Sequence, residues 1–154
     1  ENVNTQQITK SVSNFINIKK QQYPWFSGKT VGGVKLFEHF KKNNFDIERP
    51  SIGVDIKSVS LENISKSNLN NFSKYISESI SSVNGDFRQE KILETWRRVL
   101  DVYGDRDVIV FQVKLVVSSG TFIRALTEEF PFPVLLLRLK RTKIFIRDKN
   151  TETT

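Results

Sequence analysis

The chain has 154 residues, of which 24 are Lys or Arg and 17 are Asp or Glu, so its formal net charge is +7. This length predicts one domain with its own hydrophobic core. The chain has no cysteine and one histidine, which excludes disulfides and thiolate chemistry and leaves carboxylates as the other metal ligands, so we expect no metal. The basic charge favours RNA or DNA as a partner, although it is equally compatible with a soluble protein that binds neither.

Nothing in the sequence predicts a membrane protein or a secretion signal. No apolar run approaches the roughly 20 residues of a membrane span, and the first residues, ENVNTQQITK, lack the basic start and apolar middle of a signal peptide. We therefore expect a cytoplasmic protein. Its first residue is Glu rather than Met, which favours a segment of a longer protein.

The N-terminal third predicts two helices separated by a loop. Apolar residues recur at helical spacing from Ile8 to Phe15, which predicts an amphipathic helix over residues 5–18. Residues 21–33 contain Pro and a Gly pair and are predicted to be extended and loop-like. A short apolar stripe followed by two lysines predicts a second helix over residues 34–42.

The middle of the chain predicts a strand followed by an inserted helical hairpin. Residues 54–61 alternate but change phase, which predicts a bulge at residues 57–58. Residues 62–82 are rich in Ser and Asn, yet their apolar residues fall on one helix face. Asp86 provides a capping signal for a second helix that ends near Tyr103. We thus place a helical insertion at about residues 62–105.

The C-terminal third predicts further strands. Residues 111–117 alternate as a half-buried strand, and residues 121–130 form a short helix that ends before Pro131. The alternation in residues 134–148 predicts a long strand or a strand pair, and residues 150–154 are a polar tail. The fold class expected from these elements is α+β, with a mixed, mainly antiparallel sheet flanked by helices.

The residues that carry reactive groups form few patterns. The sequence contains no P-loop, no dinucleotide-binding glycine motif and no Ser/His/Asp pattern with supporting context. His39 adjoins aromatic residues on a predicted helix, which favours a surface or packing role. Arg124 sits among apolar residues after a Gly-Thr turn, and Glu128 follows four residues later, so one interpretation is an ordinary helix-surface ion pair.

Three blocks of sequence carry a resemblance to a known family. They are QQYPWFSG (21–28) followed by VGGVKLFE (31–38), IERP (47–50) followed by VDI (54–56), and SSGTFIRALTEE (118–129) followed by LKRT (139–142). In order and rough spacing they resemble the motifs Q-x-P-P-x-Y-S-A, E-R-P and G-T-Y-I-R of the TruB family of tRNA pseudouridine synthases. The blocks cover most of the chain outside the helical insertion, and a similar insertion occurs in some bacterial members.

The resemblance implies a pseudouridine synthase-like fold over residues 1–149 and a reaction that isomerises uridine to pseudouridine in the T loop of tRNA. The family needs no cofactor and no metal, and its members act on tRNA as monomers. It flips the target base out of its loop and attacks it with an aspartate. That aspartate belongs to a G-x-L-D motif that the 154 residues do not contain, so we expect this segment alone to be inactive.

The resemblance also implies roles for individual residues. Arg124 matches the arginine that pairs with the catalytic aspartate, and a guanidinium suits this role because it stays charged and binds both carboxylate oxygens. Phe122 stands where the family has tyrosine, against the flipped base, and Leu139 matches a leucine of the same pocket. The residues expected to face the tRNA backbone are Lys29, Lys35, Arg138, Lys140, Arg141 and Lys143.

A second function class remains open. The same basic surface, with Trp25 and Phe26 available for stacking on bases, is compatible with a non-catalytic RNA-binding module. An upstream G-x-L-D segment in the complete protein would favour the enzyme over this alternative.

Overall fold

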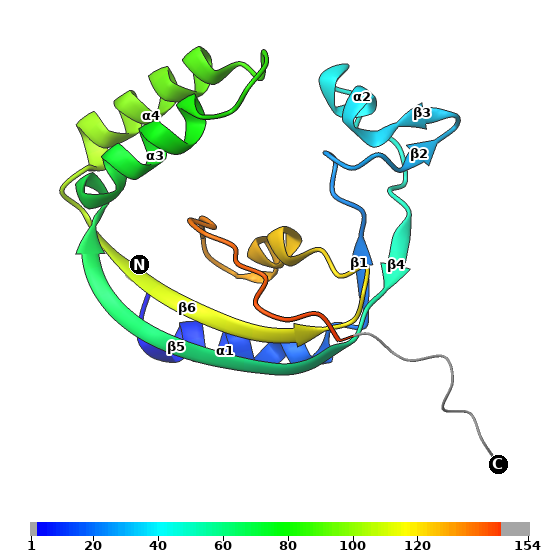
Figure 1. Ribbon diagram of the computed structural model, residues 1–154, viewed down its shortest axis with the longest axis horizontal. Coiled ribbons are helices and arrows are strands. Elements are labelled where there is room, and N and C mark those ends of the chain that lie inside the picture. The colour runs from blue at the N-terminus through cyan, green and yellow to red at the C-terminus, as the bar shows by residue number, and fades with distance from the viewer. Residues whose placement is uncertain (1–2, 146–154) are drawn as a thin grey trace.

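The computed structural model describes residues 3–145 (Figure 1). They form helices and small antiparallel sheets, which confirms the α+β class. Within these residues the strands make three separate two-stranded sheets, each antiparallel, so the expectation of one mixed sheet is wrong.

The first helix, α1, spans Thr5–Asn14 and continues as a 3-10 turn, η1, over Phe15–Asn17. The side chain of Asn4 accepts a hydrogen bond from the backbone N–H of Gln7, and the side chain of Gln7 accepts one from the backbone N–H of Asn4. This capping box satisfies two N–H groups that have no partner inside the helix. The helix expected over residues 5–18 is confirmed, with a 3-10 last turn.

The next segment forms an arm that we call the α2 arm (residues 23–50). It is carried on a short sheet in which β1 (Lys20–Gln22) pairs with β4 (Ser51–Gly53). The arm contains β2 (Thr30–Val31), β3 (Val34–Lys35) and α2 (Leu36–Lys41). Gly32 and Gly33 join β2 to β3 with φ of 58° and 80°, the positive values that a two-residue type I′ turn requires. The expected helix over residues 34–42 is confirmed in a shorter form.

A long ribbon of β5 (Ile56–Asn68) and β6 (Asp107–Val117) is the largest sheet. Its register shifts between Ile56 and Ser58, which confirms the predicted bulge at residues 57–58. A second irregularity lies between Glu62 and Ser65, where Asn63 has a φ of 49°. Asn tolerates this left-handed conformation better than most residues, so it is well suited to the irregular position.

The first part of the predicted helical insertion is wrong, because residues 62–68 belong to β5. In this stretch Ser65 pairs with Val110 and Asn68 with Asp107. The helical spacing of the apolar residues that follow suggested a helix here, but β6 is long enough to pair with the whole stretch. Ladder hydrogen bonds outweigh local propensity.

The helical hairpin (residues 69–106) follows, with η2 (Leu69–Phe72), α3 (Ser73–Ser81) and α4 (Gln89–Tyr103). The two predicted helices are confirmed in this range. Asp86 does not cap α4, because Arg88 occupies the N-cap position, with a φ of 62°. The Asp86 carboxylate instead accepts a hydrogen bond from the Arg88 N–H at 3.2 Å. Ile76 is the buried residue of α3, and α4 buries none completely, so the hairpin contributes little to the core.

The C-terminal segment differs most from expectation. Residues 121–130 contain a 3-10 helix, η3 (Ile123–Glu129), rather than an α-helix. Residues 134–145 form no strand, so the predicted strand is wrong as far as the structure describes it; the rest of that prediction and the polar tail lie outside the described residues. Alternating apolar residues form a strand only where another strand offers its edge, and none pairs with residues 134–145.

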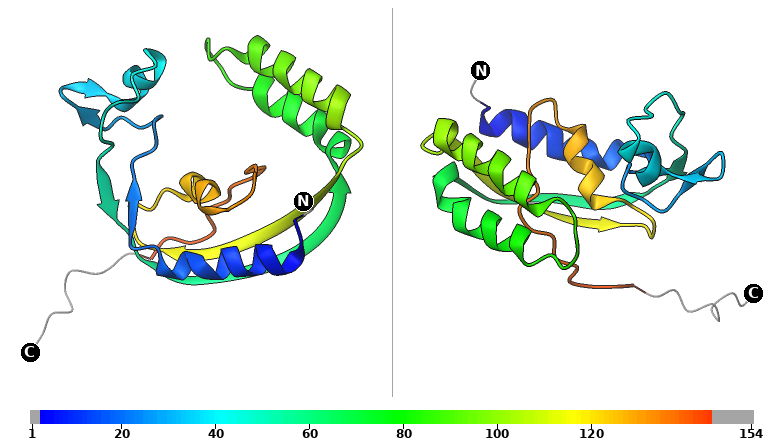
Figure 2. Two further views of the ribbon diagram at one scale, coloured as in Figure 1. Left: turned by 180° about the vertical axis from the view of Figure 1, so that it is seen from behind. Right: turned by 90° about the horizontal axis from the view of Figure 1, so that it is seen from above.

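The hydrophobic core lies where η1, β5 and η3 meet. Phe15, Ile56 and Leu126 are each 3% exposed or less, and Val59, Leu115 and Phe130 are among the side chains packed against them. The ribbon curves, with η3 inside the curve and α1 alongside β5 (Figures 1 and 2). The helical hairpin stands at one end of the ribbon and the α2 arm at the other.

Candidate functional site

A tight turn over residues 118–121 connects β6 to η3. The Thr121 N–H donates to the Ser118 carbonyl at 3.4 Å, and Gly120 has a φ of 85°. A Cβ atom at position 120 would lie 3.1 Å from Ile52 Cδ1. The left-handed backbone and this close approach together explain the glycine in the Ser-Gly-Thr sequence.

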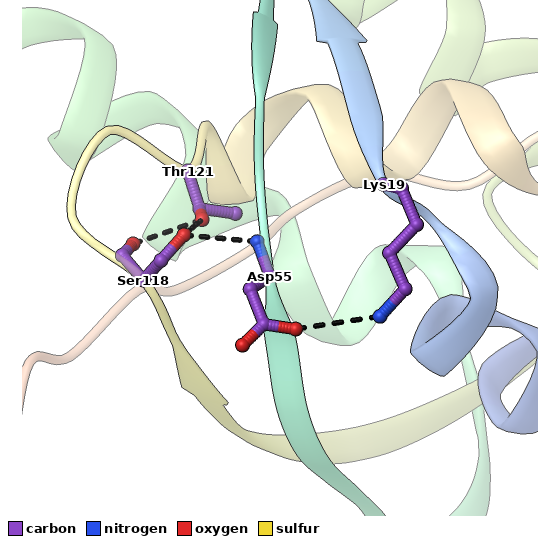
Figure 3. A network of polar contacts seen from close by, with 4 residues as sticks. All are labelled: Lys19, Asp55, Ser118 and Thr121. Atoms are coloured by element: carbon purple, nitrogen blue, oxygen red, sulfur yellow. Dashed lines mark hydrogen bonds and ion pairs between the residues drawn. The ribbon is translucent and has the colours of Figure 1, made fainter.

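Two hydroxyl groups stabilise this turn, and one of them binds it to Asp55, directly before β5 (Figure 3). Ser118 Oγ accepts from the Asp55 N–H at 2.9 Å, and the Ser118 N–H donates to the Asp55 carbonyl at 2.8 Å. Thr121 Oγ1 donates to the Ser118 carbonyl at 2.9 Å, so it accepts from the Ser118 hydroxyl across 3.2 Å. Each hydroxyl hydrogen therefore has an acceptor. Lys19 pairs with Asp55 at 3.3 Å, but both side chains are more than half exposed and the pair contributes little.

The side-chain amide of Gln21 binds the backbone of Phe122, 101 residues later in the chain. The Phe122 N–H donates to Gln21 Oε1 at 2.9 Å, and Gln21 Nε2 donates to the Phe122 carbonyl at 3.4 Å. Gln21 is only 4% exposed, so these bonds satisfy an amide that is cut off from water. They fix the position of Phe122 immediately before η3.

Arg49, in the second sequence block, forms hydrogen bonds with residues of the first block. Its Nη2 donates to Gln22 Oε1 at 2.6 Å, and its Nη1 donates to the Tyr23 carbonyl at 3.3 Å. The Tyr23 ring in turn lies 5.2 Å from the ring of Phe122, edge to face. The three blocks, distant in sequence, therefore meet around Tyr23 and Phe122.

Arg124 lies on η3 with its side chain exposed. Among residues 3–145 it forms no ion pair, so the helix-surface pair with Glu128 is not present. In a 3-10 helix residues three apart share a face, and the residue in line with Arg124 is Thr127, whose hydroxyl donates to the Arg124 carbonyl at 2.8 Å. The guanidinium is thus free of intramolecular carboxylates in the described part of the chain.

The two expected pocket residues differ in their surroundings. Phe122 is half-buried and held by Gln21 and Tyr23. Leu139 is 50% exposed and lies in the strand-free stretch of residues 134–145.

All six predicted RNA-contacting residues are exposed. Lys29 and Lys35 belong to the α2 arm, where their ammonium groups lie 5.3 Å from the Tyr23 ring and 5.6 Å from the Phe37 ring. Arg138, Lys140, Arg141 and Lys143 lie in residues 134–145, which Figure 1 draws inside and across the curve of the ribbon. The structure thus divides the basic residues between two places.

His39 is 9% exposed and fully hydrogen-bonded. Its Nε2 lies 3.2 Å from the Val31 carbonyl, and its Nδ1 lies 3.1 Å from the Asn44 amide nitrogen. A neutral ring that donates from Nε2 and accepts at Nδ1 satisfies both contacts. The packing role expected for His39 is confirmed.

Two features of this region were not predicted from the sequence. The first is the role of Gln21, which no local pattern reveals because its partner is distant. The second is that Phe40 and Phe45 form a cluster on the α2 arm with Trp25 and Phe26, the two rings expected to stack on bases. The high Phe content was the available signal for the cluster.

Over residues 3–145 no group of three or more His, Asp or Glu side chains is placed to hold a metal ion. No helix in the same range is long and apolar enough to cross a bilayer. No protein-family model, curated protein or solved structure matches the chain.

Proposed function

We propose that the chain is part of a TruB-like pseudouridine synthase that isomerises a uridine in the T arm of tRNA, as a cytoplasmic monomer and without a cofactor. The observation that carries the proposal is the convergence of the three motif blocks. Gln21 and Tyr23 of the first block contact Phe122 of the third. Arg49 of the second block binds Gln22 and Tyr23. A functional site assembled from distant segments requires this kind of proximity, and unrelated surface residues do not.

The proposed roles follow from the chemistry of the side chains. Arg124 orients the nucleophilic aspartate and keeps it ionised beside the flipped base. Phe122 stacks on that base, and Leu139 lines the same pocket. The G-x-L-D motif of the family is not among the 154 residues, so the proposed reaction takes its aspartate from outside them.

Arg124→Lys in the complete protein tests this role. We expect single-turnover pseudouridine formation at saturating enzyme to fall about a hundredfold, because lysine keeps the charge but loses the two-pronged orientation of the carboxylate. The tRNA affinity should change little. Glu128→Gln is the matched control and should leave both quantities unaltered. A near-normal rate for Arg124→Lys would show that Arg124 does not belong to the active site.

The isolated chain separates the enzyme from the second candidate, a non-catalytic RNA-binding module. The exposed aromatic cluster favours RNA binding in either case. We expect the 154 residues alone to bind tRNA without forming pseudouridine, and the complete protein to form it. A complete protein that binds tRNA but converts no uridine favours the binding module.

A further inference from the structure

Four aromatic side chains of the α2 arm form one continuous cluster, which we call the aromatic platform. Trp25 and Phe45 lie 5.2 Å apart between ring centroids, Phe26 and Phe40 lie 4.5 Å apart, and Phe40 contacts Phe45 at 5.6 Å. Trp25 also lies 6.3 Å from Phe40. The rings therefore support one another in edge-to-face and tilted arrangements, which are favourable geometries for aromatic pairs.

The platform is open to solvent on its outer side. Phe26 is 66% exposed and Phe45 is 49% exposed, although both rings have aromatic neighbours within the cluster. Single exposed apolar residues are common, but several rings in contact form a patch of the kind that binds other molecules.

One cation lies beside a platform ring, and two more lie on or next to α2 beside the neighbouring ring of Phe37. The Arg49 guanidinium lies 5.1 Å from the Trp25 ring centroid. The ammonium groups of Lys35 and Lys41 lie 5.6 Å and 5.5 Å from the Phe37 ring, on the same helix as Phe40 or next to it. Exposed rings on the same arm as these cations match a ligand that alternates flat apolar faces with negative charges, which describes unpaired nucleotides.

We propose that the aromatic platform binds unpaired bases of RNA, with Phe26 and Phe45 stacking on the bases and the adjacent lysines facing the phosphates. The proposal rests on the RNA-binding part of the proposed function. Tyr23 links the platform to the candidate site. Its ring contacts Phe122, and its backbone carbonyl accepts a hydrogen bond from Arg49, whose guanidinium lies over the Trp25 ring. The platform thus extends the RNA path from the base beside Phe122 toward neighbouring unpaired nucleotides.

Tryptophan fluorescence tests the location, because the chain has two tryptophans and only Trp25 belongs to the platform. In Trp96→Phe, titration of the full chain with a short uridine oligonucleotide should quench the remaining Trp25. In Trp25→Phe, the remaining Trp96 on the helical hairpin should keep its emission.

Alanine substitutions test the energetics. Phe26→Ala and Phe45→Ala should each weaken oligonucleotide binding about tenfold, with an unchanged salt dependence because no charge is removed. Phe87→Ala is the matched control, since Phe87 is 62% exposed but lies on the helical hairpin, and it should bind normally. The platform proposal is wrong if both platform variants bind with normal affinity, or if Trp25 is not quenched while RNA is bound. Either result leaves the proposed enzyme activity unaffected. If Trp25 is quenched and the platform variants lose affinity, the platform proposal is supported. If the complete protein then forms no pseudouridine, the proposed enzyme activity is wrong.

Discussion

At the residue scale, Gln21 has the most informative set of contacts. Its side chain replaces a strand partner for Phe122, since it offers a carbonyl and an N–H to the backbone of one residue. An amide is the side chain that supplies both groups without a charge, which suits a position only 4% exposed. Gln21 is therefore a positioning residue that acts on η3 through Phe122.

Gln21→Leu keeps a similar volume but removes both hydrogen bonds. We expect the free energy of unfolding in urea to fall by about 1–3 kcal/mol, because the Phe122 N–H is left without an acceptor in a half-buried place. Gln6→Leu makes the same chemical change at an exposed position of α1 and should stay within about 0.5 kcal/mol of the original. Equal effects of the two substitutions would show that the contact with Phe122 contributes nothing.

At the element scale, the turn over residues 118–121 decides where η3 begins. The Ser118 hydroxyl binds this turn to Asp55, directly before β5, and the Thr121 hydroxyl closes the turn on Ser118. Gly120 supplies its left-handed backbone. Because Arg124 follows within the first turn of η3, an error in this connection moves the guanidinium.

Gly120→Ala tests whether the turn requires a residue without a Cβ atom at position 120. The substitution places a Cβ atom 3.1 Å from Ile52 Cδ1 in a residue with a φ of 85°, so we expect a loss of about 1–2 kcal/mol in thermal or urea unfolding. Gly28→Ala is a suitable control, since no atom lies within 4 Å of its added Cβ and its φ is not positive. A Gly120 variant as stable as the Gly28 variant would mean that the turn relaxes without cost.

The helical hairpin buries little, so we expect the ribbon to fold without it. Residues 69–106 contain six basic and six acidic side chains, so the net charge of +7 lies entirely outside them. A hydrogen bond from the Tyr75 hydroxyl to the Leu137 carbonyl at 2.9 Å joins the hairpin to the C-terminal segment. Neither its charge nor this hydrogen bond predicts that the hairpin contributes to RNA affinity.

Replacement of residues 69–106 by an Asn-Gly turn joins the paired residues Asn68 and Asp107 directly. We expect the shortened protein to unfold cooperatively and to bind tRNA within about twofold of the original, because no net charge is removed. Circular dichroism during heating and filter binding measure the two properties. Loss of the cooperative transition would instead show that the hairpin stabilises the ribbon.

At the scale of the whole molecule, charge is distributed unevenly. The α2 arm and residues 134–145 carry the basic residues predicted to meet RNA, whereas the helical hairpin at the other end of the ribbon is neutral overall. Affinity for RNA should therefore be electrostatic, and it should depend on which end of the molecule loses charge.

The double variant Lys29→Gln and Lys35→Gln tests this asymmetry. The tRNA affinity of the original protein should fall as salt rises, and the variant should have a shallower dependence, by about 0.7 in slope for each phosphate that it no longer neutralises. Lys74→Gln with Lys91→Gln removes the same charge from the helical hairpin and should leave the slope unchanged. Equal slopes for both double variants would show that only net charge matters.

The sequence by itself determined the elements whose hydrogen bonds or apolar faces are local. These include α1, the bulge at residues 57–58 and the helices of the hairpin. Only the tertiary structure decided whether residues 62–68 pair with β6, whether residues 134–145 find a strand partner, and that Gln21 meets Phe122. The physical reason is that a helix satisfies its own backbone, whereas a strand or a buried amide depends on a partner whose distance along the chain no local pattern encodes.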